Sequence, residues 1–382
     1  MLVVFFCVAA RAEVAATFLP TEDSQIVARL RPSGLNSNER ELRTLRASLA
    51  QNPTNPSLAT DFARRLISQA RREADPRYLG QAEVALGPWW TQAVPPVEVL
   101  VLRATIRQSL HDFPSALADL DAALAIDRHN VQAWLTKATV HTVRGEFEAA
   151  RHACVPLLRL ADNLTAMTAA ATVASLTGDA DHSLKLLGDA LARESQAPVA
   201  TRVWALTQLA ETSDRLGHVA EADGHFRAAL AMSPHDPYLL GAYADFLLDQ
   251  RRSAEVAVLL RDFSRMDGLL LRLAEAHAAL PADAALKSEM AARFANARER
   301  GDLVHQREEA RFTLRLLGQP ATALRLAREN WTVQKEPADA RLLLETARAA
   351  KDRAVEAEVL AWVTMTRLED IHIQPGALAS LP

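Results

Sequence analysis

The chain has 382 residues, of which 73 are alanine and 56 are leucine, whereas six are isoleucine and three are tyrosine. Alanine is the strongest helix former and strands favour β-branched and aromatic residues, so this composition predicts an all-α protein and excludes a large β-sheet. The 43 basic and 47 acidic residues give a net charge of −4. There is no basic excess to hold phosphates, which argues against a nucleic-acid groove.

The N-terminus opens with an apolar run over residues 2–10, followed by Ala-Arg-Ala at 10–12. Such a run before a small–x–small site is typical of a secretory signal peptide. We expect residues 1–12 to be a signal peptide and the mature chain, from about Glu13, to be periplasmic or secreted. The alternative is a buried helix end in a cytoplasmic protein. No other apolar stretch approaches the roughly 18 residues of a membrane span, so we expect no transmembrane segment in the mature chain.

The pattern after the N-terminus predicts a loosely ordered segment over 13–38 and then a capping helix over 39–51. The prolines at 53 and 56 break this helix, and a degenerate first repeat follows over 56–90. The cysteines are Cys7 and Cys154, so the mature chain cannot form an internal disulfide. We interpret Cys154 as a small core residue.

Two later windows, 97–130 and 131–164, align without gaps at a spacing of 34 residues. A third window, 203–236, carries the same pattern of small and large apolar residues. The aligned positions of the first two windows are Ala104 and Ala138, Phe113 and Phe147, Ala116 and Ala150, and Leu124 and Leu158. Small residues let two helices of a hairpin approach closely, while leucine and phenylalanine fill the wider gaps.

Glycine placement supports this register. Gly145, Gly178, Gly217 and Gly318 each precede a short predicted helix that carries a small residue five positions further on. Each glycine can end the first helix of a pair in the left-handed conformation that other residues adopt at a cost.

The spacing of these small residues, large apolar residues and turn glycines resembles that of the tetratricopeptide repeat family over most of the chain, from about Asn55 to Leu368. The resemblance implies an α-solenoid of stacked antiparallel helix pairs in a right-handed superhelix, continuous over 39–370 and followed by a tail over 371–382. The clearest repeats are 97–130, 131–164, 203–236, 237–270, 304–337 and 338–370.

Some units depart from the pattern. Arg251 stands in place of the turn glycine in the unit that begins at Pro237, and Lys351-Asp352 does so in the last unit. The stretch 269–302 has lost most marks, and we expect two long helices joined at Pro281.

The sequence offers little that is typical of an enzyme. No two glycines lie closer than seven positions apart, which excludes phosphate-binding glycine loops and the glycine-flanked serine of a nucleophile elbow. None of the eleven histidines occurs in the HExxH arrangement that binds zinc. We expect no catalytic residues, no metal ligands and no cofactor.

In tetratricopeptide proteins the first helix of each pair lines a concave groove, and this resemblance gives the candidate binding residues. They are Trp204, Thr207, Glu211 and Asp214 in one repeat, and Tyr238, Asp245 and Asp249 in the next. Aromatic rings flanked by carboxylates fit an extended, apolar-to-basic peptide. The alternative interpretation is that Trp204 packs between repeats and the acids are ordinary surface.

A second candidate surface is Trp89-Trp90, for which the alternative is that both rings plug a junction between repeats. Trp134, by contrast, takes the family's packing position, and we expect it in the core.

The sequence therefore predicts a non-catalytic interaction scaffold that presents a concave groove to a protein or peptide in the bacterial cell envelope. One alternative is a helical enzyme or metal-dependent factor whose site is assembled from distant residues, in 269–302 or around Trp89. Another is an intracellular regulator, if the N-terminal run is not a signal. Fold alone does not decide among them.

Overall fold

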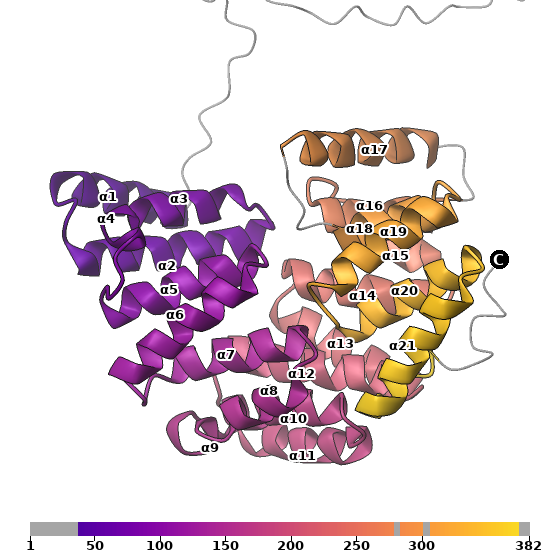
Figure 1. Cartoon of the computed structure of the whole chain (residues 1–382), viewed down its shortest axis with the longest axis horizontal. Helices are drawn as coiled ribbons and strands as arrows, with labels where there is room; N and C mark the ends of the chain where they lie inside the picture. Colours follow the sequence, from indigo (N-terminus) through magenta and orange to yellow (C-terminus); the bar gives the residue numbers. More distant parts are fainter. Residues whose placement is uncertain (1–36, 279–282, 301–305, 374–382) are drawn as a thin grey trace, which may run out of the picture.

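The computed structural model describes residues 37–278, 283–300 and 306–373, and all regular secondary structure in these ranges is helical. Consecutive helices pack as antiparallel pairs, and the pairs stack into a strongly curved array (Figure 1). The predicted signal peptide, Pro281 and the end of the predicted tail lie outside the described residues. Within the described ranges, no helix combines the length and apolar character needed to cross a membrane. The predicted all-α repeat fold is confirmed.

The helices of the N-terminal half are α1 (Ser37–Gln51), α2 (Pro56–Glu73), α3 (Arg77–Ala85), α4 (Gly87–Trp90), α5 (Val97–Ser109), α6 (Phe113–Ile126), α7 (Val131–Val143), α8 (Phe147–Cys154), α9 (Leu157–Leu160), α10 (Asn163–Ser175) and α11 (Ala180–Arg193). Those that follow are α12 (Val199–Arg215), α13 (Val219–Met232), α14 (Pro237–Asp249), α15 (Ser253–Leu260), α16 (Asp267–Ala276), α17 (Asp283–Glu299), α18 (Gln306–Arg315), α19 (Pro320–Trp331), α20 (Pro337–Ala349) and α21 (Arg353–Thr366).

Helix starts in several repeats are fixed by side-chain caps. Asn130, Asp162 and Asp236 precede α7, α10 and α14, and each side chain accepts a hydrogen bond from a backbone N–H in the first turn of its helix. Such a cap satisfies a donor that has no partner within the helix and contributes about 1 kcal/mol. The caps recur because the first backbone N–H groups of each of these helices have no partner within the helix.

The four predicted turn glycines adopt the conformation expected of them. Gly145, Gly178, Gly217 and Gly318 have φ of 72°, 82°, 80° and 63°, in the turns that join α7 to α8, α10 to α11, α12 to α13 and α18 to α19. Arg251 and Lys351 occupy the corresponding turns without glycine and have φ of 58° and 60°. These two turns keep the repeat geometry at the cost of about 1–2 kcal/mol that a left-handed residue with a side chain incurs.

The small residues lie where the two helices of a pair meet. Ala138 on α7 and Ala150 on α8 are buried, as are Ala210 on α12 and Ala222 on α13. Because each alanine presents only a methyl group, the helix axes can approach closely. Trp134 is partly buried against this packing, and Cys154 is buried in it.

The C-terminal part of the chain packs back against the middle of the array. One hydrophobic cluster combines buried residues of α7, α8 and α10 with buried residues of α18 to α21. Within it, the ring of Trp362 lies 5.0 Å from that of Trp331 and 6.2 Å from that of Phe147, between ring centroids. Segments more than two hundred residues apart therefore share one core.

Backbone hydrogen bonds fix this closure along a row of turns. The N–H of Lys335 donates to the carbonyl of Val143 (2.7 Å), and the N–H of Ile371 donates to the carbonyl of Arg215 (2.9 Å). Between these two bonds, the N–H of Ala180 donates to the carboxylate of Glu369 (2.9 Å). The packed part of the chain continues to Ile373, which is buried, so residues 371–373 belong to the closure and not to a trailing tail.

The turn glycines lie directly under this closing segment. A Cβ atom on Gly178 would come within 2.9 Å of the Cβ of Arg367, and one on Gly145 within 3.1 Å of the Cβ of Lys335. One on Gly217 would lie 3.2 Å from the Cδ1 of Ile371, whereas one on Gly318 would meet nothing within 4 Å. Three of the four glycines therefore lie in tight contact with the closing segment, and the approach is closest at Gly178.

We expect Gly178→Ala to lower the free energy of unfolding by about 2–3 kcal/mol, because it adds a clash to the left-handed strain. The matched control, Gly318→Ala, has the strain without the clash and should cost about 1 kcal/mol. Urea unfolding followed by circular dichroism measures both values. Equal losses in the two variants would mean that the closing segment does not press on the turn at Gly178.

Candidate functional site

The seven predicted binding residues lie on α12 and α14, the first helices of neighbouring pairs. Four belong to α12 (Trp204, Thr207, Glu211 and Asp214) and three to α14 (Tyr238, Asp245 and Asp249). Thr207 is buried, and its hydroxyl donates to the carbonyl of Val203 in its own helix (2.8 Å). Trp204 is partly buried and packs against the shared core of α7, α10 and α20. These two residues therefore contribute to packing. The other five provide the polar groups on this face of α12 and α14.

Tyr238 and Glu211 connect the two repeats. The hydroxyl of Tyr238 donates to Oε1 of Glu211 (2.6 Å), and the amide of Gln208 donates to its Oε2 (2.8 Å). Although the side chain of Tyr238 is 62% exposed, burial raises the pKa of its hydroxyl. Both observations fit a tyrosine whose hydroxyl lies against Glu211 on α12 while its ring faces outward.

Burial disfavours the charged form of Glu211 by more than its neighbours favour it. Burial raises the pKa of Glu211 to about 7, and the negative charge of Glu336 adds to this effect. The hydrogen bond from Tyr238 and the charge of Arg215 act in the opposite direction without cancelling it. The Glu211 carboxyl is therefore partly protonated near neutral pH.

Asp245 has two arginine partners from other repeats. Arg272 on α16 lies 2.5 Å and Arg311 on α18 lies 2.7 Å from its carboxylate. Burial alone would raise the pKa of Asp245, but the charges of these two arginines outweigh it and hold the pKa well below its usual range. Asp245 is ionised and occupied, not free to receive a basic ligand.

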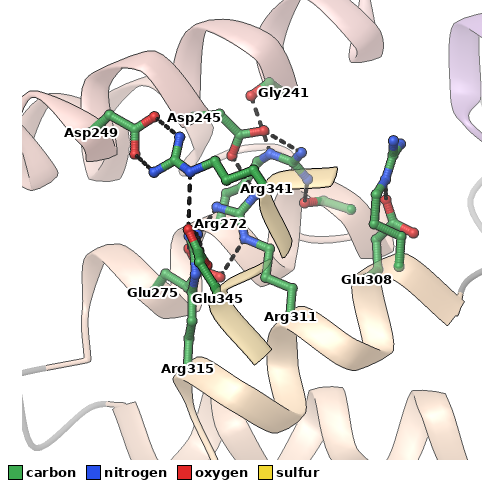
Figure 2. Close-up of polar contacts among 12 residues, drawn as sticks. Gly241, Asp245, Asp249, Arg272, Glu275, Glu308, Arg311, Arg315, Arg341 and Glu345 are labelled. Atoms are coloured by element: carbon green, nitrogen blue, oxygen red, sulfur yellow. Dashed lines mark hydrogen bonds and ion pairs between the residues drawn. The ribbon is translucent and has the colours of Figure 1, made fainter. Parts of the chain in front are cut away.

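Asp245 and Asp249 belong to a longer network that crosses four repeats (Figure 2). Acidic and basic side chains alternate along it, and each is joined to the next by contacts of 2.5 to 3.4 Å. In order, the members of this arginine–carboxylate chain are Arg272, Asp245, Arg311, Glu275, Arg315, Glu345, Arg341 and Asp249. The four arginines balance the four carboxylates. The acids of α14 therefore belong to a group of side chains with no net charge.

Residue spacing explains why the helices supply this chain. Asp245 and Asp249 are four apart, as are Arg311 and Arg315, and these pairs share one helical face. The first helices α14, α16, α18 and α20 each contribute two members. This repeated spacing was visible in the sequence, but the partners lie in different repeats and only the curvature of the array brings them together.

Asp214 lies beside residues far from it in the sequence. Its Oδ2 is 3.3 Å from Nε2 of His372, which follows α21. One ligand atom each of Asp214, Asp249 and His372 lies within 4.8 Å of the other two, and all three side chains are partly buried. The sequence pattern gave no reason to bring these three residues together, because His372 reaches the site only through the chain closure.

The second candidate surface is closed. Trp89 is buried and Trp90 partly buried in the core of α2, α3 and α5. The guanidinium of Arg103 donates to the carbonyl oxygens of both residues and forms a buried ion pair with Asp119 at 2.6 Å. The two rings therefore fill a junction between repeats, as the alternative interpretation proposed.

Comparison with known proteins gives similar solved structures at low sequence identity. The fold resembles that of tetratricopeptide repeat proteins. One similar solved structure is a tetratricopeptide repeat protein from Parabacteroides merdae ATCC 43184, at 15% identity and a TM-score of 0.40, covering 74% of this chain and 98% of that one. Another is human IFIT1, solved as a dimer with m7Gppp-AAAA, at 13% identity and a TM-score of 0.38, covering 86% of each chain. No family model and no curated protein matches the sequence.

We expect Asp245→Asn to lower the free energy of unfolding at neutral pH by about 2–3 kcal/mol, since it leaves Arg272 and Arg311 without their shared charged acceptor. A depressed carboxyl pKa stabilises the fold above the unfolded pKa and loses its effect as pH falls, so the difference from the parent protein should shrink below about pH 4. Urea unfolding at several pH values measures this. Glu255→Gln, in an exposed pair with Arg252, is the control and should leave the free energy of unfolding nearly unchanged.

In contrast to Asp245→Asn, Glu211→Gln should raise the free energy of unfolding at high pH. Because the folded pKa of Glu211 lies above its unfolded value of about 4.3, the parent protein loses stability as pH rises from about 4 to 7. Glutamine keeps an acceptor for Tyr238 without a charge, so the variant should be more stable than the parent by about 1–2 kcal/mol at pH 8 and no more stable at pH 4. The same unfolding experiment at the two pH values tests this. A variant less stable at pH 8 would contradict the assignment.

Proposed function

We propose that the protein is a non-catalytic interaction scaffold that binds an extended peptide or protein segment at the exposed ring of Tyr238. The single observation that carries this proposal is the contrast among the seven candidate residues. Tyr238 is 62% exposed, whereas the other six are buried or partly buried and have partners within the chain. A tyrosine fixed by its hydroxyl and exposed by its ring offers a large contact area at little cost in conformational entropy.

The chemistry around the ring favours an apolar or basic side chain of the partner. The face of an aromatic ring attracts cations, and Glu211 places a carboxyl at the edge of the same ring. Asp245 and Asp249 already have arginine partners, so they contribute less to recognition than the sequence alone suggests. We therefore place recognition at Tyr238 and Glu211 and not along the whole row of acids.

A non-catalytic role is supported by the ion pairing of the carboxylates in the arginine–carboxylate chain. They lie between guanidinium groups, which keep the pKa values of Asp245 and Glu345 low despite burial. A carboxylate held in this way is a poor proton donor or acceptor near neutral pH. The arginine–carboxylate chain is suited to holding repeats together and not to acid–base chemistry.

We further propose that the protein acts in the bacterial cell envelope after export. The support is the N-terminal sequence alone, where an apolar run precedes Ala-Arg-Ala at 10–12. N-terminal sequencing of the protein from its host tests this proposal. A start near Glu13 is the expected result, and an intact Met1 in the soluble cytosol would contradict it.

Selection from a library of displayed random peptides tests the binding proposal directly. The full chain should enrich peptides with apolar and basic residues, and Tyr238→Ala should weaken their binding at least tenfold, a loss of about 1.4 kcal/mol. The matched control is Val258→Ala, on the outer helix α15 of the same pair and 68% exposed. Enriched peptides that bind both variants equally, or the failure to enrich any, would refute recognition at Tyr238.

A further inference from the structure

Asp214, Asp249 and His372 come from three separate segments and converge at one point. Asp214 lies in the last turn of α12, Asp249 is the last residue of α14, and His372 follows α21. Two of their atoms, Oδ1 of Asp214 and Nε2 of His372, are buried without a hydrogen bond. Buried polar atoms are nearly always hydrogen-bonded, so these two require an explanation.

The distance between Asp214 and His372 suits metal ligands better than a strong hydrogen bond. Their nearest atoms, Oδ2 and Nε2, are 3.3 Å apart. A charge-assisted N–H···O bond is about 2.7–2.9 Å long. Two ligands of a tetrahedral zinc ion, each about 2.0–2.1 Å from the metal, are separated by about 3.3–3.4 Å. The observed spacing corresponds to one edge of such a tetrahedron.

Asp249 retains the capacity to bind a cation although Arg341 holds it. The Nη1 and Nη2 atoms of Arg341 donate to Oδ2 and Oδ1 of Asp249 at 2.5 and 2.7 Å. A carboxylate has about four lone-pair sites, and a bidentate arginine uses one on each oxygen. Each oxygen of Asp249 therefore keeps one site, with Arg341 fixing the orientation of the carboxylate as outer-shell partners of metal ligands do.

The local charge also favours a cation. The ionisable neighbours are the carboxylates of Asp214, Asp249 and Asp370 and the guanidiniums of Arg341 and Arg215. Three negative and two positive charges leave one net negative charge around the imidazole of His372. In addition, α12 and α14 both direct their C-terminal ends, which carry partial negative charge, toward the site.

We propose that Asp214, Asp249 and His372 form a binding site for a divalent zinc ion, which fastens the C-terminal segment to α12 and α14. One imidazole and two carboxylates are zinc ligands, whereas magnesium and calcium take oxygen ligands and gain nothing from His372. Water completes the coordination. This zinc clasp is independent of the proposed peptide site, because it shares no residue with Tyr238 or Glu211.

Titration of zinc chloride into the chelator-treated full chain at about pH 7.5, followed by calorimetry, tests the clasp, because zinc binds the neutral imidazole and displaces any proton from it. We expect one zinc ion per chain and a rise in Tm when zinc is present in excess. His372→Gln and Asp214→Asn should each weaken zinc binding more than tenfold, because loss of an outer-shell partner alone has that effect. His372→Cys should restore binding, since a thiolate is also a zinc ligand.

His182→Gln, which removes an exposed histidine on α11, is the control and should leave zinc binding unchanged. Circular dichroism of each variant without metal separates loss of the site from loss of the fold. No zinc uptake by the folded parent protein would overturn the proposal and leave a protonated His372 paired with Asp214 as the whole role of the cluster. Zinc uptake that survives in folded His372→Gln and Asp214→Asn would overturn it equally.

Discussion

The contact between the C-terminal segment and the turns at Gly145, Gly178 and Gly217 determines the shape of this molecule. In an open repeat array each unit contacts only its neighbours, and stability is a sum of local terms. Here three hydrogen bonds, two of them between backbone atoms, connect Lys335, Glu369 and Ile371 to the middle of the chain, and a single core spans both regions. The C-terminal end of the array is thereby coupled to its middle, so we expect the middle and C-terminal repeats to unfold together. The glycines serve this contact twice, through their positive φ and through the space that a missing Cβ leaves.

The arginine–carboxylate chain follows from the same curvature. Ionised side chains inside a fold are stable only when each has a partner, because the loss of water is costly and removal of one partner leaves an uncompensated charge. The first helices α14, α16, α18 and α20 meet this condition together, and no single repeat does so alone. Arg341 illustrates the point, since it joins Glu345 on its own helix to Asp249 on a helix three pairs earlier. The chain of charges therefore helps to fix the angle between repeats.

The features that could be predicted from the sequence are those decided within about 34 residues. The helix pairs, the left-handed glycines and the buried alanines all follow from local spacing, and the structure confirms them. The positions of the candidate residues on α12 and α14 followed from the same register, but their surroundings did not. Asp245 looks like an available acid until Arg272 and Arg311 are placed beside it, and His372 looks like part of a tail until the array closes. Long-range pairing depends on the sum of many small rotations between repeats, which leave no mark at any one position.

The closure also decides which surface is left for a partner. In an open superhelix the inner face of every first helix is available, and a peptide can run along several repeats. In this chain α20, α21 and residues 371–373 lie against α7, α10, α12 and α14, where they use backbone groups and acids that an open groove would present. The exposed ring of Tyr238 remains available, and it is the recognition site that we propose. A zinc ion at Asp214, Asp249 and His372 would stabilise the closed form by contacting both sides of the closure. It would favour partners that fit the closed array over those that require it to open, because a ligand shifts an equilibrium only toward the state that it binds more tightly.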